Sequence, residues 1–68
     1  MRFTPREREV MLCLYSGLSY AKAAEQLGCA PQTVRVHVNN IAAKLPEVPR
    51  GVPARKAVEL FIEERAHR

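Results

Sequence analysis

Four side chains between residues 32 and 39 have the chemistry needed to recognise DNA bases: Gln32, Arg35, Val36 and Asn39. An arginine can donate two hydrogen bonds to guanine, asparagine and glutamine can pair with adenine, and a valine methyl group can pack against the methyl group of thymine. Because residues three and four apart share one face of an α-helix, a helix over this segment would present all four together. The spacing therefore predicts contacts with base edges in the major groove. For Val36 the alternative is an ordinary exposed valine.

Polar and basic residues beside this face have the types that bind phosphate groups. Thr33, Asn40 and Lys44 lie towards one flank of the same predicted helix. His37 lies on its shoulder, where it can donate a hydrogen bond to a phosphate; the alternatives are a packing residue or a pH-sensitive switch. No acidic residue occurs from position 26 to position 46, so nothing in this segment repels phosphates.

The chain as a whole is basic. Its 68 residues include 11 Lys and Arg against 7 Asp and Glu, which gives a formal net charge of +4, and the isoelectric point is about 9.6. Most of the acidic residues lie near the two ends of the chain. We therefore expect one basic face and a polyanionic partner, double-stranded DNA.

Other function classes lack support in the sequence. The chain has no aspartate, no nucleophile with a matching base, and no glycine-rich phosphate loop. Cys13 and Cys29 form no CxxC pair and have no regularly spaced histidine, so we expect small buried apolar residues rather than zinc ligands. No apolar run is long enough to span a membrane, and the first residues do not resemble a secretory signal. We expect a cytoplasmic protein that is not an enzyme, needs no metal or cofactor, and does not insert into a membrane.

Capping signals place four helices at about residues 5–16, 20–27, 31–45 and 53–66. Thr4, Pro5 and Glu7 form a predicted capping box, and Ser19 and Pro31 are suited to start the next two helices. Gly17 and Gly28 are suited to end the first two helices. Three prolines and Gly51 make residues 46–53 an irregular connection. The prediction is an all-α domain over residues 1–68 that contains a helix-turn-helix.

Apolar spacing indicates which side of each helix faces the core. The third helix carries a stripe of apolar residues, and the first and fourth helices carry apolar faces of their own. The predicted core residues are Phe3, Val10, Cys13, Leu14, Val34, Val38, Ile41, Leu45, Ala54, Ala57, Val58, Phe61 and Ile62. Leu60 points outward in this pattern. Leu12 lies opposite the core face of its helix and, with Tyr15, is either a contact surface or packs beneath the fourth helix.

The segments FTPREREVM, GLS, AAEQLG and TVRVHVNNIAAKL resemble the DNA-binding domain of the LuxR/FixJ response-regulator family, also called the GerE type. The resemblance covers residues 3–45 and extends more weakly over 51–61. It implies that the third helix enters the major groove and that the fourth helps two subunits pair. Arg35, Val36 and Asn39 match groove-contacting positions, and Thr33, His37 and Lys44 match positions for phosphate contact or helix positioning. The predicted homodimer or partner surface consists of Ala57, Leu60 and Glu64 on the fourth helix, together with Leu12, which is included because of its position opposite the core face of the first helix.

This sequence departs from the family pattern at three places. Ala30 stands where the family has a serine or threonine N-cap, at a cost of about 1 kcal/mol. Asn39 stands where the family has a basic residue, so the base preference cannot be transferred. Residues 46–50 resemble an insertion, which alters the expected placement of the fourth helix and the geometry of a dimer.

Three functions fit these observations. The first is a sequence-specific transcriptional regulator that binds as a dimer to half-sites about one helical turn apart. The second function has the same fold but another partner, because GLSYAKAAEQLG also resembles the fourth region of sigma factors. In this case Leu12, Tyr15 and residues 46–53 would contact RNA polymerase. The third is an interaction adaptor that does not bind DNA, which leaves the acid-free segment without an explanation.

Overall fold

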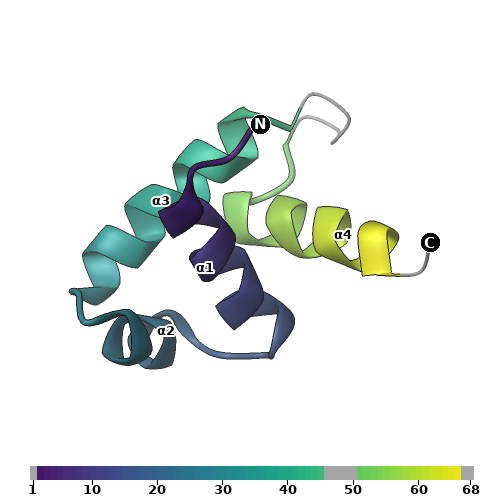
Figure 1. Ribbon diagram of the computed structural model, residues 1–68. Helices are drawn as coiled ribbons and strands as arrows, with labels where there is room; N and C mark the ends of the chain where they lie inside the picture. The colour runs from purple at the N-terminus through teal and green to yellow at the C-terminus, as the bar shows by residue number, and fades with distance from the viewer. Residues whose placement is uncertain (1, 46–50, 67–68) are drawn as a thin grey trace.

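The computed structural model describes residues 2–45 and 51–66, and in these ranges it consists of four α-helices joined by turns. The helices are α1 (Pro5–Tyr15), α2 (Tyr20–Leu27), α3 (Pro31–Ala43) and α4 (Ala54–Ala66) (Figure 1). The helix α3 contacts each of the other three. The predicted all-α architecture with a helix-turn-helix is confirmed.

Local sequence signals determine where the first two helices begin and end. The Thr4 hydroxyl accepts a hydrogen bond from the Glu7 amide at 3.1 Å, and the Thr4 amide donates to the Glu7 carboxylate at 2.9 Å, which completes the predicted capping box. The Ser19 hydroxyl accepts from the Lys22 amide at 3.1 Å. Gly28 ends α2 with φ at +71°, a left-handed conformation that lets the chain reverse into α3.

The core lies beneath α3. Val34, Val38 and Ile41 are fully buried on one side of this helix, as the apolar stripe predicts. Ala23 and Ala24 of α2 are also buried, and their small side chains allow α2 to lie close to α3. The cluster also contains Val10, Cys13 and Leu14 of α1, Val58 of α4, and Leu45, which follows α3. Ala57 of α4 is buried as well, and Phe3, Ala54, Phe61 and Ile62 pack against the cluster half-buried.

The predicted helix boundaries need small corrections. We predicted that the third helix runs to Leu45, but α3 ends at Ala43. The amides of Lys44 and Leu45 bond to the carbonyls three residues earlier, at 2.9 and 3.1 Å, because the last turn tightens and the following proline disfavours helical geometry. Leu45 remains buried. The first helix, predicted to reach about Ser16, ends at Tyr15 because Ser16 is its C-cap. The fourth helix begins at Ala54, within the predicted start near Pro53 or Ala54, and the carbonyl of Pro53 accepts from the Ala57 amide.

Residues 51–53 are not helical, as predicted for this connection. The predicted insertion at residues 46–50 lies outside the described part of the chain.

Candidate nucleic-acid interface

The side of α3 that faces away from the core carries the predicted base-contacting residues. Gln32, Arg35, Val36 and Asn39 are all exposed, on the opposite side from the buried valines. Val36 is 47% exposed although it is apolar. No acidic residue lies on α3. The structure therefore brings these four side chains together on one surface, with no negative charge from their own helix.

Arg35 is positioned by an aromatic ring that the sequence analysis did not identify. Its guanidinium carbon lies 5.7 Å from the centre of the Tyr20 ring, at the start of α2. The guanidinium carbon of Arg55, from α4, lies 4.9 Å from the centre of the same ring. A cation over an aromatic face is favourable, so Tyr20 holds two arginines from two different helices. The sequence places Tyr20 at the start of the predicted second helix, but it does not indicate that Arg35 and Arg55 lie against its ring.

The predicted phosphate-contacting residues have different surroundings. Thr33 and Asn40 are exposed, and His37 is half-buried on the shoulder of α3. Lys44, at the end of α3, donates a hydrogen bond of 2.6 Å from Nζ to Oε1 of Glu7. Its ammonium group therefore belongs to an ion pair between α1 and α3, which sequence reasoning did not predict.

Glu7 is buried at this junction, with 4% of its surface exposed. The hydrogen bond from Lys44 and the bond from the Thr4 amide hold the pKa of the Glu7 carboxyl below its ordinary value, against the opposing effect of burial. Arg2 reinforces the same corner by donating from Nη1 to the Lys44 carbonyl at 3.1 Å. Glu7 thus joins the N-terminus of α1 to the C-terminus of α3 and helps to fix the orientation of α3.

The N-terminus of α3 has no side-chain cap. Ala30 has the extended conformation of an N-cap residue, with φ at −81° and ψ at 150°, but its methyl group accepts no hydrogen bond. Pro31 occupies the first helical position, where its missing N–H costs nothing. The expected departure at Ala30 is therefore present in the structure as an uncapped helix.

The predicted dimer or partner surface is only partly exposed. Ala57 is 4% exposed and packs inside the protein, so it cannot contribute to an outer surface of α4. Leu60 is 39% exposed and points outward as predicted, and Glu64 is exposed. Leu12 is exposed on α1 rather than packed beneath α4, which settles the choice left open by the sequence in favour of a surface position.

The described residues offer no metal site: in residues 2–45 and 51–66, no three histidine, cysteine or acidic side chains come together. Cys13 is buried and Cys29 is half-buried, and both are free thiols. None of the helices in the described ranges has the length and apolar character needed to cross a bilayer.

A short helix, a tight turn at a left-handed glycine, and a following helix with an exposed polar face define a helix-turn-helix domain. The chain belongs to the luxR family of bacterial regulatory proteins, whose family model matches residues 1–48. This confirms the resemblance seen in the sequence. Helix-turn-helix domains of the LuxR type bind DNA, and the family is one of transcriptional regulators rather than enzymes.

Two curated relatives support this assignment. The chain is 37% identical over 57 residues to the transcriptional activator protein CarR of Pectobacterium carotovorum subsp. carotovorum, an alignment that covers 84% of this chain and 23% of the relative. It is 44% identical over 50 residues to the transcriptional regulatory protein FixJ of Azorhizobium caulinodans, covering 66% of this chain and 24% of the relative. The chain thus spans about a quarter of the length of these relatives. No solved structure matches it.

Proposed function

We propose that this chain is a sequence-specific transcriptional regulator that inserts α3 into the major groove of double-stranded DNA. The observation that carries the proposal is the exposed side of α3, where Gln32, Arg35, Val36 and Asn39 lie together on a helix without acidic residues. These side chains offer donors and acceptors for purine edges and a methyl group for thymine. The two curated relatives are named as a transcriptional activator and a transcriptional regulatory protein, which agrees with a regulatory role.

The flanks of α3 hold the DNA backbone in this proposal. Thr33 and Asn40 are exposed and can donate to phosphate oxygens, and His37 contributes from the shoulder. Lys44 keeps its bond to Glu7 and still reaches a phosphate, because an ammonium group has three donors and this side chain is only partly buried.

Two copies bind together on adjacent half-sites, with α4 of each copy facing the other. Leu60 and Glu64 supply the exposed side of α4, beside Lys56 and Glu63. A stable interface usually buries about 800 Å² on each partner, and one leucine among charged residues supplies much less apolar area. The dimer therefore forms on DNA, where neighbouring half-sites raise the effective concentration of the second copy.

The test is selection from a pool of randomised duplexes. The double variant Arg35→Ala, Asn39→Ala is compared with the wild type, and Arg8→Ala serves as the control because it also removes one positive charge, from an exposed position of α1 outside both α3 and the proposed dimer face of α4. We expect the wild type and the control to enrich one two-fold symmetric motif, and the double variant to lose it with a penalty of about 1–3 kcal/mol for each base contact. Equal enrichment by all three proteins would contradict groove reading by α3. Binding to RNA polymerase in place of free DNA would support a sigma-like role.

A further inference from the structure

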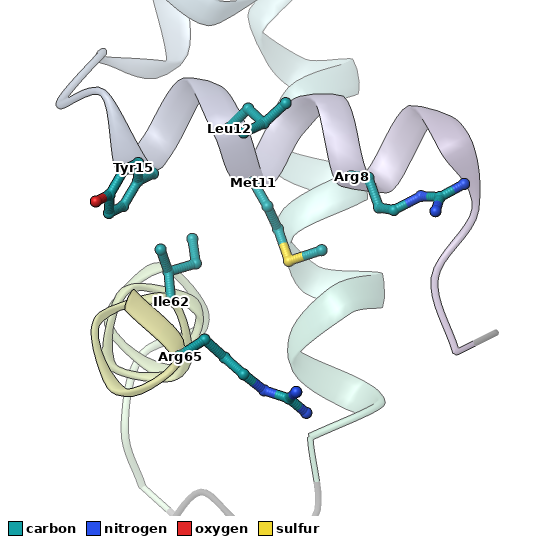
Figure 2. Close-up of a pocket in the computed structure, with 6 residues that line it drawn as sticks. All are labelled: Arg8, Met11, Leu12, Tyr15, Ile62 and Arg65. Carbon is teal, nitrogen blue, oxygen red and sulfur yellow. The ribbon is translucent and has the colours of Figure 1, made fainter. Parts of the chain in front are cut away.

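An open groove runs between α1 and α4. Its volume is about 490 Å³, and its lining consists of Arg8, Met11, Leu12, Tyr15, Ile62 and Arg65 (Figure 2). A second hollow of about 400 Å³ shares Arg8, Met11 and Arg65 with the first and continues towards Phe3 and Phe61. We call the two together the α1–α4 groove. It follows α1 from its N-terminal segment to its last turn.

The floor of the groove is apolar and open to solvent. Leu12 is 66% exposed and Tyr15 is 61% exposed, which makes them the most exposed large hydrophobic residues in the described part of the chain. Met11 and Ile62, which are half-buried, also line the groove. Single exposed apolar side chains are common on protein surfaces, but a contiguous apolar patch is unfavourable in water. Apolar side chains gathered in one concave surface are therefore typical of an interaction site.

The rim of the groove is positively charged. Arg8 and Arg65 line its first part, Arg2 joins them in the second, and no acidic residue lines either part. Arg65 lies over the ring of Phe61, with 5.0 Å between the guanidinium carbon and the ring centre, so its charge is held at the edge of the apolar floor. The complementary occupant is apolar in its centre and acidic at its sides.

A second copy of this chain does not match that description well. Its one exposed large apolar residue on α4 is Leu60, which lies about 200° around the helix from Ile62 at 100° per residue and so faces away from the groove. A copy that docked Leu60 into a neighbour's groove would leave its own groove open, and such a head-to-tail contact continues into a chain of molecules instead of closing.

We propose that the α1–α4 groove binds an amphipathic acidic helix from another protein, with aliphatic residues at i, i+3, i+4 and i+7 and glutamates or aspartates beside them. A helix laid in a groove is a recurrent mode of recognition. Figure 2 shows α3 behind the groove, and its recognition residues point away from the core, so this partner and DNA occupy opposite sides of the domain. The partner binds whether or not DNA is present.

Two synthetic helical peptides of about 16 residues, a length sufficient for several turns, provide the test. Both carry leucines at the stated spacing; one has flanking glutamates and the other has flanking lysines. Fluorescence anisotropy of the labelled peptides against the full chain should show about tenfold tighter binding of the glutamate peptide. The variant Leu12→Lys should weaken that binding by about tenfold. Leu60→Lys, an equal change on the other side of α4, should leave it unchanged.

Further variants and outcomes complete the experiment. Arg65→Glu should remove the preference for the glutamate peptide, and circular dichroism checks that each variant is folded. Equal binding of both peptides, or full binding by Leu12→Lys, would overturn the proposal. A dimer of the free wild type that Leu12→Lys dissociates in sedimentation would show instead that a second copy fills the groove. The peptide result stands apart from DNA binding, so either proposal can fail without the other.

Discussion

Glu7 shows how one side chain serves both a helix terminus and a tertiary contact. Its carboxylate accepts from the amide of Thr4, the N-cap residue of α1, and from the Lys44 ammonium at the end of α3. A buried carboxylate is costly unless charge-assisted hydrogen bonds replace its lost hydration. Here two such donors do so, and the carboxyl has a lowered pKa as a result.

Glu7→Gln should therefore destabilise the protein by about 2 kcal/mol at pH 7, because the Lys44 ammonium loses its charged partner. Since the folded-state pKa of Glu7 lies below the unfolded value, its stabilisation is fully present above the ordinary glutamate pKa and is lost as pH falls through the lower folded-state pKa. Urea unfolding of both proteins between pH 7 and pH 3 measures this. The difference in free energy of unfolding should shrink as the pH falls, and a constant difference would contradict the assignment.

The contacts of single residues mark the limit of what the sequence could predict. The capping role of Glu7 follows from its spacing of three residues from Thr4, a local pattern that the sequence alone shows. Its pairing with Lys44 joins residues 37 positions apart, and only the packing of α1 against α3 creates it. Tyr20 is a similar case, because its two arginines come from α3 and α4. The candidate surface on α3 was predictable because one helix carries it all.

The helix α3 begins without a capping side chain, and this makes its N-terminus open to improvement. Ala30→Ser should stabilise the protein by about 1 kcal/mol, because the hydroxyl can accept from an amide in the first turn. For a domain of this size that corresponds to a rise of about 4–8 °C in Tm. Thermal denaturation followed by circular dichroism measures the change. Ala43→Ser, an exposed site at the other end of α3, is the control and should give no rise.

Arg55 links α4 to the helix-turn-helix through contacts with Leu18 and Tyr20. Its Nη2 donates to the Leu18 carbonyl at 2.8 Å, its Nε lies 3.4 Å from the Glu59 carboxylate, and its guanidinium stacks on Tyr20. A planar guanidinium makes these contacts simultaneously, which a lysine ammonium cannot do.

Arg55→Met should lower the free energy of unfolding by about 1–2 kcal/mol, because a charge-assisted hydrogen bond and a cation–π contact are lost while the aliphatic stem is kept. Arg55→Lys should recover less than half of this loss. Lys56→Met, on the exposed side of the same turn, is the matched control and should have little effect. Equal stability of the Met variants at positions 55 and 56 would show that Arg55 does not fasten α4.

At the scale of the whole molecule, the net charge of +4 is arranged so that α3 carries no acidic residue. If each subunit neutralises about four phosphates, the logarithm of affinity against the logarithm of salt concentration should have a slope of about −3.6 per subunit. Titration of one duplex at several salt concentrations measures it. A flat response would contradict binding through the phosphate backbone.

The order and approximate bounds of the helices were predictable because local signals agree with the global fold. The capping box at Thr4 specifies the start of α1, Ser19 and the left-handed Gly28 specify the two ends of α2, and the stripe of Val34, Val38 and Ile41 specifies the buried side of α3. The α1–α4 groove was not predictable, because it depends on the angle at which two helices cross. The sequence placed Leu12 opposite the core face of its helix without deciding whether α4 covers it, and only the packed structure shows that it is exposed and lines a groove with Ile62 and Arg65.

The two buried alanines of α2 limit the variation that this chain can tolerate. A larger side chain at Ala23 or Ala24 would force α2 away from α3, and overpacking of this kind costs about 1–3 kcal/mol. Lys22 and Glu25, on either side of them, are exposed and accept almost any residue. In a library of variants selected for folding, positions 23 and 24 should therefore retain only the smallest residues. Positions 22 and 25 should accept many different residues.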